Sequence, residues 1–557
     1  MRYNHAELFA GVAAALPERD CIVFRNRRLT YRDVSERVNR LANLLLAQGI
    51  TVHRERPELQ PWESGQDHVA LYLHNGNEYL EGMIGAAAAR AASLNVNYRY
   101  VEAELTYLLN DSAPAAIIYH ARFAPTLSAV LDSLSAPPKI LLQVADESGN
   151  ALLPGAFDYE EALAASSPDA PATAPEPDDL YLLYTGGTTG MPKGVLWTQA
   201  EILDGGLGAF LPEGMFGVPT LAEGIALVAA ADRRVVLPLP PLMHGAAQWM
   251  ALAGLLGGGT IVFPDVVDRL DPESIWQLID RECVQMMNLV GNAFATPLCD
   301  EFERGDHDGS SLQLVGVGGA VTSAAVKDRI LGLLPQVVIA DVAGSSETGS
   351  QLTNLSTSGA PATSGVFTPA AGTCVVDEDR RRILQPGDPD TGWLARAGAI
   401  PLGYLNDRDK TERTFPTVDG LRVSLPGDRA RHRADGIIEL LGRDSVTINS
   451  GGEKIFAEEV EDALIGHPAV RDVVVVGRPS DRWGSEVVAV VELVAGLDPS
   501  DQDLLADAEQ RLARYKLPKA IVRVDAVLRS PAGKADYRWA KDIAAVAEPS
   551  AQKELIK

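Results

Sequence analysis

The sequence predicts an α/β fold, with a large N-terminal domain of α/β sheets, a β-rich subdomain and a small α+β C-terminal domain. Apolar runs of strand length alternate with segments of helical periodicity through most of the chain, as in parallel sheets covered on both faces. Short strands with Gly/Asp turns follow, and then a further unit with its own strands and helices. A chain of 557 residues is also too long for one core.

Composition and charge are those of a soluble globular enzyme, with 46% hydrophobic and 22% charged residues. The formal net charge of −26 and the pI near 4.8 argue against nucleic acid or an anionic membrane as the main partner. Cys21, Cys283, Cys299 and Cys374 are scattered without a CxxC pair, so neither a zinc site nor a disulfide framework is predicted. Reduced cysteines and an N-terminus without an apolar segment favour a cytoplasmic location.

One run, residues 246–263, approaches the length of a membrane span. Gln248 and the glycines at 254 and 257–259 interrupt it, which favours a buried helix followed by a strand. We therefore expect no integral membrane segment.

The N-terminal part begins with a predicted hairpin and a helix. Residues 21–24 and 29–31 flank an arginine-rich turn as two strands, and residues 34–46 carry apolar side chains at helical spacing. The polar segment 51–67 predicts an exposed, mobile insertion. Further predicted elements are a strand at 69–73, a helix at 75–91 and strands at 115–119 and 140–144.

The stretch from Tyr184 to Gly194 predicts a phosphate-binding loop. It follows an apolar strand, 180–183, and reads Tyr-Thr-Gly-Gly-Thr-Thr-Gly-Met-Pro-Lys-Gly. Glycines let successive N–H groups converge on an anion, threonine hydroxyls add donors, and Lys193 supplies a charge. The common ATPase loop has Ser or Thr directly after its lysine, whereas Gly194 stands there. Taken alone, the stretch is also compatible with an ordinary Gly/Thr-rich surface turn.

Further candidate ligand positions lie at the ends of predicted strands. A strand broken by prolines, from 234, ends in His244 at the start of a helix, although a lone histidine is more often structural. The strand at 312–317 opens into Gly318-Gly319-Ala320, and the strand at 337–340 opens into a turn that contains Gly344 and Glu347. In α/β sheets ligands bind at such strand ends, so these turns and the glycine-rich loop are expected to converge on one ligand.

The last third of the chain changes character. Residues 373–378, 392–395 and 436–441 predict short antiparallel strands. Beyond 445–455, a helix at 457–464, strands at 470–476 and 487–493, a helix at 503–513 and a strand at 521–524 predict an independent domain with its own sheet. The last glycine-flanked lysine is Lys534, which by itself would be an ordinary solvated charge.

The order of these motifs resembles the adenylate-forming superfamily of acyl-CoA synthetases, firefly-type luciferases and peptide-synthetase adenylation domains. The resemblance covers almost the whole chain. It makes the glycine-rich loop a pyrophosphate grip, with Gly186 where the family usually has Ser. It implies a domain 1–442 that binds ATP and the acyl group, a hinge at 443–446 and a mobile domain 447–557.

The resemblance also implies roles for individual residues. The turn Gly318-Gly319-Ala320 matches the adenine-binding turn. The segment Ala343-Gly344-Ser345-Ser346-Glu347 matches a Tyr-Gly-x-Thr-Glu motif, with Ala343 in place of an aromatic residue and Glu347 as the magnesium ligand. The implied cofactor-binding residues are Thr185, Gly186, Gly187, Thr188, Thr189, Gly190, Lys193, Gly318, Gly319, Ala320, Ser345, Ser346, Asp428, Arg443, Gly451, Gly452 and Lys454.

Among these, Asp428 and Arg443 are implied to contact the ribose, and Asp444 to be the hinge. Lys534 and Glu347 are the implied catalytic residues, with Thr185 beside Glu347 at the metal. The implied lining of the acyl pocket is His244, Gln248, Asn292 and Gly344. ATP, Mg²⁺ and coenzyme A are the implied cofactors, and a small carboxylic acid is the implied partner; a homodimer stays open.

A narrower resemblance concerns residues 64–73, 95–100 and 450–454 and the Arg-Ser-Pro-Ala-Gly-Lys ending. These stretches are similar to actinobacterial acyl-CoA ligases, including ligases of steroid side-chain carboxylates. The implied reaction forms acyl-AMP from acid and ATP, and then the coenzyme A thioester, after rotation at Asp444 replaces Lys534 with the loop 450–454. The implied acid is a steroid side-chain acid or a medium- to long-chain fatty acid.

Three alternatives remain at this point. The acceptor could be a carrier-protein thiol instead of free coenzyme A. A luciferase-type oxygenase shares the same motifs. A non-catalytic acyl- or nucleotide-binding protein is the third, although the presence of Glu347, Asp428, Arg443 and Lys534 argues against it.

Overall fold

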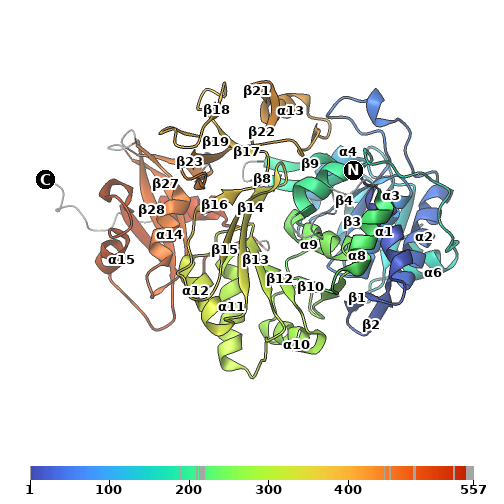
Figure 1. The fold of residues 1–557 in the computed structure, drawn as a ribbon, viewed down its shortest axis with the longest axis horizontal. Coiled ribbons are helices and arrows are strands. Elements are labelled where there is room, and N and C mark those ends of the chain that lie inside the picture. Colours follow the sequence, from blue (N-terminus) through green and yellow to red (C-terminus); the bar gives the residue numbers. More distant parts are fainter. Residues whose placement is uncertain are drawn as a thin grey trace.

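The computed structural model describes residues 2–187, 190–208, 211, 220–443, 446–450, 453–480, 484–530 and 533–546. Figure 1 shows the N-terminal elements on the right, the middle of the chain in the centre and the C-terminal elements on the left. Two large sheets form the first two of these parts, and a smaller sheet forms the third.

The first sheet has the strand order β20-β9-β8-β4-β3-β5-β6-β7, and its strands from β8 to β7 run parallel. Its strands are β3 (His68–Tyr72), β4 (Ala92–Asn95), β5 (Ala116–His120), β6 (Ile140–Val144), β7 (Phe157–Asp158), β8 (Leu180–Gly187), β9 (Gly190–Thr198) and β20 (Gly403–Tyr404). Around it lie α1 (His5–Ala15), α2 (Tyr31–Ala47), α3 (Asn77–Ala88), α4 (Glu102–Ser112), α5 (Ala124–Leu131), α6 (Tyr159–Ala164) and α7 (Gln199–Ile202).

Alternation along β3 explains why helices cover both faces. Val69 and Leu71 pack with α1, α2 and α3, whereas Ala70 and Tyr72 pack with α4 and α5. The helices begin where side chains can cap them. In α2, Thr30 and Asp33 form a reciprocal capping box, which satisfies two N–H groups at the helix start.

The second sheet has the order β18-β17-β19-β23-β24-β16-β15-β14-β13-β12-β10-β11-β1-β2 and is parallel from β14 to β1. Its strands are β1 (Asp20–Phe24), β2 (Arg27–Thr30), β10 (Val235–Pro238), β11 (Thr260–Phe263), β12 (Met286–Leu289), β13 (Leu314–Gly318), β14 (Val338–Ser345), β15 (Gly349–Ser356), β16 (Val366–Pro369), β17 (Thr373–Val376), β18 (Ile383–Leu384), β19 (Thr391–Ala397), β23 (Asp428–His432) and β24 (Ile438–Arg443), with β21 (Thr417–Val418) and β22 (Leu421–Ser424) beside β19.

The helices of this second part are α8 (Leu221–Ala230), α9 (Gly245–Leu256), α10 (Pro272–Glu282), α11 (Gly291–Arg304), α12 (Ala324–Leu333) and α13 (Arg408–Thr414). A π-helical turn, Leu203–Leu207, continues α7. Short 3₁₀ turns lie at Arg56–Glu58 and Ala121–Phe123.

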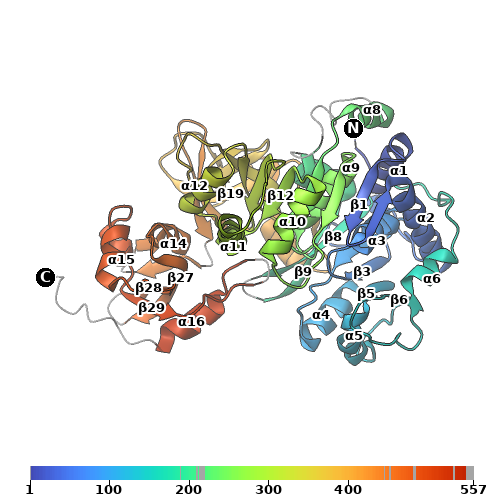
Figure 2. The same ribbon diagram turned by 90° about the horizontal axis from the view of Figure 1, so that it is seen from below.

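The C-terminal part has its own core. It contains the hairpin β25 (Ile448–Ser450) and β26 (Glu453–Ile455), the sheet β27 (Val470–Ser480), β28 (Gly484–Leu493) and β29 (Ala520–Val524), and the helices α14 (Ala457–Ile465), α15 (Asp501–Ala508) and α16 (Tyr537–Val546), with a 3₁₀ turn at Arg514–Lys516. Valines on the two faces of β27 enter two separate clusters, one under α14 and one under α16. Figure 2 shows the segment before α16 reaching toward the central part.

The predicted fold class is confirmed, and most predicted elements have the predicted type. Residues 246–263 form α9 and β11, and no helix among the described residues is long and apolar enough to cross a membrane. The expected β-rich subdomain joins the large sheet through the β16–β24 pairing. The sequence analysis missed several elements, among them β4, α10, β12, α11 and α16. The four residues of β4 show no clear alternation, and α16 follows a loop that was assigned a chemical role.

Candidate active site

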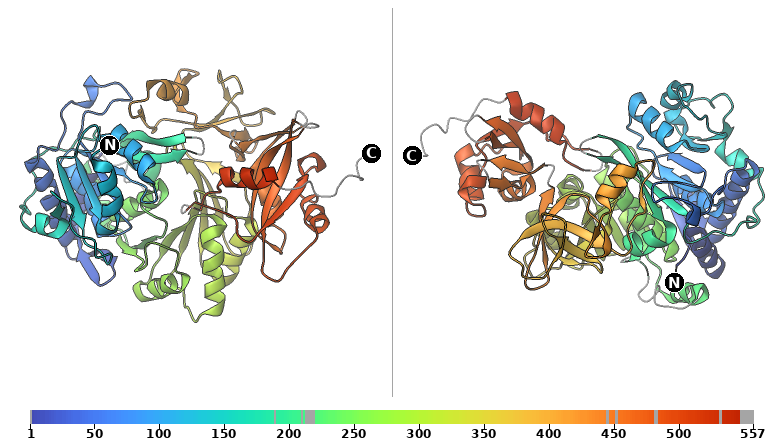
Figure 3. Two further views of the ribbon diagram at one scale, coloured as in Figure 1. Left: turned by 180° about the vertical axis from the view of Figure 1, so that it is seen from behind. Right: turned by 90° about the horizontal axis from the view of Figure 1, so that it is seen from above.

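The glycine-rich stretch lies at the tip of the hairpin β8–β9, which extends toward the centre of the molecule (Figure 3). Thr185 on β8 is paired with Lys193 on β9, so both side chains lie on the same face of the hairpin. The glycine-rich stretch is therefore followed by an antiparallel strand, β9. Of the predicted residues, Thr188 and Thr189 lie outside the described residues, and Gly186, Gly187 and Gly190 are placed by their backbone alone.

Asn95 holds this hairpin beside the loop that ends in His244. Its buried amide donates to the carbonyl of Tyr184 at 2.8 Å and to the carbonyl of Met243 at 2.7 Å, and it accepts the N–H of Tyr184 at 2.7 Å. One side chain on β4 thus satisfies polar groups of two different segments. This contact places the start of the glycine-rich stretch and His244 at one site.

The turn between β14 and β15 holds Glu347. The Tyr404 hydroxyl donates to Glu347 Oε1 at 2.7 Å, and the Ser424 hydroxyl donates to the Glu347 carbonyl at 2.7 Å. The Trp197 indole donates to the Ser346 carbonyl at 2.8 Å, and the Thr348 hydroxyl accepts the N–H of Ser345 at 3.0 Å. Bonds to three other strands therefore fix this turn.

Two lysines lie near Glu347 and Tyr404. The ammonium of Lys410, on α13, stands 4.2 Å from the centre of the Tyr404 ring. Partial burial and the neighbouring Lys193 ammonium lower the pKa of Lys410 to about 8, against opposing contributions from Glu347 and Asp407. Burial, and then the Glu347 carboxylate, raise the pKa of the Tyr404 hydroxyl, which stays neutral and can donate.

The predicted adenine turn lies at the end of β13. Gly318 pairs with Val342 of β14, and a side chain at this position would meet the Val342 carbonyl at 2.6 Å. Gly319 has φ +77, which favours glycine. Ala320 packs against Gly291, the first residue of α11. Two of the three predicted turn residues are therefore required by backbone geometry.

The predicted ribose residues face each other across two strands. Asp428 begins β23 and is paired with Arg443, at the end of β24. The side chain of Arg443 and all of Asp444 lie outside what the structure describes. Just before them, Gly442 has φ +114, and a Cβ at this position would lie 2.4 Å from Glu458 Oε2 of α14. The C-terminal part therefore packs closely against the end of β24.

The loop of Lys534 reaches the site from the C-terminal part. Gly533 lies so close to Val290, at the start of α11, that a Cβ would be 2.8 Å from its side chain. Burial, the charge of Lys534 and then that of Arg99 lower the pKa of His244 to about 3. His244 is therefore a neutral imidazole, and within the described part of the chain its Nε2 is buried without a hydrogen-bond partner.

The predicted acyl-pocket residues have different surroundings. Gln248 is 2% exposed, and its amide bonds Tyr181 at 2.5 Å and the Leu242 carbonyl at 2.7 Å. Asn292 accepts the N–H of Ser323 at 3.0 Å, at the start of α12. A Cβ at Gly344 would lie 2.0 Å from the Gly349 carbonyl, so the β14–β15 hairpin itself requires this glycine.

The predicted coenzyme A loop is only partly described. Gly451 and Gly452 lie outside the described residues, and Lys454 is placed by its backbone in β26. Ser450, just before them, is paired with Glu453. The placement of this loop relative to the site therefore stays a prediction.

Sequence reasoning missed Arg396, whose buried side chain joins two of the segments that form the site. Its Nη1 donates to the carbonyls of Gly205, Thr348 and Ser350 at 2.8, 2.7 and 2.8 Å, and the side chain is buried. Gly205 belongs to the π-helical turn and Thr348 to the Glu347 turn, so one guanidinium joins the two. Tyr404, Lys410 and Arg99 were missed as well: Arg99 lies in the stretch 95–100, to which the sequence analysis gave no role at the site, and the other two lie outside the stretches it used.

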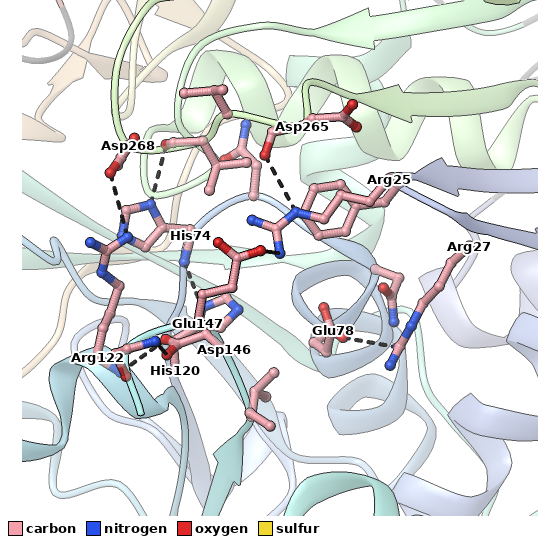
Figure 4. A pocket seen from close by; sticks show the side chains of 18 of the residues that line it. Arg25, Arg27, His74, Glu78, His120, Arg122, Asp146, Glu147, Asp265 and Asp268 are labelled. Atoms are coloured by element: carbon pink, nitrogen blue, oxygen red, sulfur yellow. Dashed lines mark hydrogen bonds and ion pairs between the residues drawn. The ribbon is translucent and has the colours of Figure 1, made fainter. Parts of the chain in front are cut away.

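A cavity of about 510 Å³ lies away from these residues, at the ends of β3, β5, β6 and β11 (Figure 4). Four arginines line it, and all four are paired with acids of the same cavity: Arg25 with Glu147, Arg27 with Glu78, and Arg122 and Arg269 with Asp268. The cavity contains none of the residues assigned above from the sequence.

Comparison with known proteins places the chain in a family. Residues 9–404 match the model of the AMP-binding enzyme, and residues 459–534 match its C-terminal domain. The chain is 53% identical to the medium-chain acyl-CoA ligase Mig of Mycobacterium avium, over 95% of this chain and 96% of that protein. It is 39% identical to the 3-oxocholest-4-en-26-oate–CoA ligase of Rhodococcus rhodochrous, over 97% and 96%.

Among solved structures, the chain resembles the anthranilate CoA ligase AuaEII in complex with anthranoyl-AMP. The TM-score is 0.80 at 21% identity, and the alignment covers 98% of each chain. At this identity the likeness concerns the fold, and it extends over both the large part and the C-terminal part.

Proposed function

The chain belongs to the AMP-binding enzyme family, and we propose that it is an ATP-dependent acyl-CoA ligase that works in two steps at the site between β8–β9, β14–β15 and the Lys534 loop. One observation carries this assignment to the site. Asn95 joins the phosphate hairpin to the His244 loop, and Lys534 is close enough to lower the pKa of His244. Groups that suit phosphate and groups that suit a carboxylate therefore meet at one place.

In the first step, a carboxylate oxygen of the acid attacks the α-phosphorus of ATP, the bond to the β-phosphate breaks, and acyl-AMP and pyrophosphate form. Both reactants are anions, so fixed positive charge must offset their repulsion. Lys193, on β9, provides positive charge for the phosphates. Lys534, from the C-terminal part, provides it for the reacting carboxylate and α-phosphate. His244 stays neutral, so its imidazole can bond the acid without adding charge.

In the second step, the thiol sulfur of coenzyme A attacks the acyl carbonyl carbon, and AMP leaves with the electron pair of the anhydride bond. Lys534 has no role here. The C-terminal domain 447–557 turns about a hinge at 443–446, near Gly442, and brings the loop 450–454 to the thiol. Asp428 and Arg443, paired across β23 and β24, hold the ribose through both steps.

The residues near Glu347 suit Mg²⁺. Carboxylate and hydroxyl oxygens are the ligands Mg²⁺ prefers, and it is usually held by one or two carboxylates together with substrate phosphates. Within the described residues, no three His, Cys, Asp or Glu side chains are grouped to hold a metal alone. Glu347, assisted by the Thr185 hydroxyl, would hold the ion, which supplies positive charge to the phosphates when bound.

For the acid, we favour a medium-chain fatty acid over a steroid side-chain acid, because the relative at 53% identity is a medium-chain ligase and the relative at 39% is a steroid ligase. Acid-dependent pyrophosphate release, measured across fatty, aromatic and steroid acids, tests both the reaction and the acid. Thioester formation with free coenzyme A, confirmed by mass, separates it from transfer to a carrier protein. Release by no acid would contradict the proposed function.

A further inference from the structure

Beyond the family's motifs, a second lysine stands at the phosphate end of the site. We propose that Lys410 binds the β- and γ-phosphates of ATP together with Lys193 and so stabilises the pyrophosphate that leaves in the first step. This inference rests on the proposed function. Four features of the structure support it.

The first feature is that Lys410 is held in place. It occupies the first turn of α13, where the Asp407 side chain caps its N–H at 2.9 Å. The Thr411 hydroxyl, one residue further, accepts the N–H of Tyr404 at 2.9 Å and so ties α13 to β20. The stem of Lys410 therefore runs along the Tyr404 ring, and its ammonium has a defined position 4.2 Å from the ring centre.

The second feature is the neighbourhood of that ammonium. Tyr404 touches Glu347 through its hydroxyl, at 2.7 Å. Tyr404 is also paired with Val195 on β9, and Lys193 lies two residues before Val195 on the same face of that strand. Lys410 thus stands beside the two residues that the proposed function assigns to the phosphates and their magnesium.

The third feature is crowding of like charge. Partial burial and then the nearby Lys193 ammonium disfavour the charge of Lys410 and lower its pKa. Of the described carboxylates that affect Lys410, Glu347 is bonded to Tyr404, and Asp407 caps the helix. A polyphosphate would relieve this repulsion, since it offers several anionic oxygens to both ammonium groups.

The fourth feature is a contrast within the same helix. Arg408, two residues earlier, forms an i,i+4 ion pair with Glu412 at 2.8 Å and lies over Trp62, on the exposed side. No described carboxylate forms such a pair with Lys410. A lysine that served only to stabilise α13 would gain more from a carboxylate than from a second lysine.

The test uses Lys410→Met, which keeps an apolar stem on Tyr404 and removes the charge, and Lys410→Arg, which restores the charge. Arg408→Met is the matched control on the exposed side of α13. Binding of pyrophosphate with Mg²⁺ to the full-length protein is measured by calorimetry without any acid. The melting temperature of each variant shows that it is folded.

We expect Lys410→Met to weaken pyrophosphate binding, and to lower kcat/KM for ATP, by about 10- to 100-fold, because one charge-assisted hydrogen bond to the phosphates is lost. Lys410→Arg should recover most of this loss, and Arg408→Met should bind as the wild type does. Thioester formation from supplied acyl-AMP should not change, because pyrophosphate has already left.

Equal pyrophosphate affinity in the wild type and Lys410→Met would overturn the inference, even if the melting temperature fell. An equal loss in Arg408→Met would also overturn it, because the effect would then belong to the helix. If the wild type bound pyrophosphate through Lys410 but released none with any acid, the proposed function would fail and the binding site would stand.

Discussion

Two regions of this molecule gather charged side chains, and they treat charge in opposite ways. In the cavity of Figure 4, each of the four arginines has an acid of the same cavity as its partner. At the phosphate end of the candidate active site, Lys193 and Lys410 lie close together. The nearby Glu347 carboxylate already accepts a hydrogen bond from the Tyr404 hydroxyl.

On the proposed function, the difference separates a cluster that holds segments together from one that binds a ligand. Charges that compensate each other hold segments together and leave no demand for a ligand, whereas like charges brought together raise the free energy of the empty site. In a chain whose net charge is −26, the proposed function gives the lysines near Glu347 an anion to bind. The cavity of Figure 4 contains none of the residues to which the proposed function assigns a role.

The largest effect is expected at the boundary between the two parts of the chain. Lys534→Ala should lower acid-dependent pyrophosphate release by about 10³-fold, because a charge aimed at the reacting centre is lost. Thioester formation from supplied acyl-AMP should fall far less. The two rates are measured separately. Equal losses in both would contradict the claim that Lys534 acts in the first step only.

A smaller loss of activity is expected when the Glu347 carboxylate is replaced by a neutral amide. Glu347→Gln should reduce the same rate by about 10²-fold and raise the Mg²⁺ concentration needed for half-maximal activity, because a neutral amide is a poorer ligand for Mg²⁺. Activity is titrated with Mg²⁺ for both proteins. An unchanged Mg²⁺ requirement would argue against Glu347 as the metal ligand.

Arg396→Met should destabilise the protein by about 3 kcal/mol, since three carbonyls lose a buried charged donor. It should also raise the KM for the acid, because the π-helical turn and the Glu347 turn are no longer joined. Chemical unfolding and steady-state kinetics check the two effects. A stable variant with normal kinetics would show that the three bonds contribute little.

Changes in the charged residues of the cavity should affect the stability of the protein rather than its catalytic rate. Burial, and then the nearby Glu81 carboxylate, raise the pKa of Glu78 from its ordinary 4.5 to about 7. The folded protein therefore binds more protons than the unfolded chain between these values, and this contribution to stability, complete below pH 4.5, is lost as pH rises through 7. Glu78→Gln should flatten the fall in melting temperature from pH 5 to pH 8, and an unchanged slope would contradict the shift.

The smallest effect is expected at the rim of the cavity. Arg122→Ala removes a half-exposed partner of Asp268, 3.6 Å away, and such pairs contribute little. We expect kcat/KM for ATP and for the acid to stay within about twofold of the wild type. A tenfold loss of kcat/KM in this variant would mean that the cavity takes part in the reaction. It would contradict the view that the cavity charges are only structural.

The sequence could predict the fold class and the local motifs, because these depend on neighbouring residues. A continuous apolar run marks β3, and glycine-rich turns mark the ends of β8 and β13. Gly318 and Gly319 could be found since their backbone geometry excludes other residues. Gly344 was predicted to line the acyl pocket, whereas the structure shows a backbone contact that already requires glycine.

The rest depends on strand order, which no local pattern contains. Tyr404 meets Glu347 because β20 joins the edge of the first sheet beside β9, more than 200 residues earlier in the chain. Arg396 meets the π-helical turn for a similar reason, across 191 residues. Gln248 was assigned to the acyl pocket from family position, and the structure commits its amide to core partners.

The junction at Gly442 has a consequence for how the two parts of the chain could be uncoupled. Since φ is +114 there and the carboxylate of Glu458 stands where a β-carbon would be, an alanine at this position would strain the end of β24 and displace the Glu458 side chain of α14. Gly442→Ala would then weaken the contact between α14 and this strand. Because Gly442 directly precedes the proposed hinge at 443–446, the proposed function predicts that this one carbon atom changes the balance between the two half-reactions.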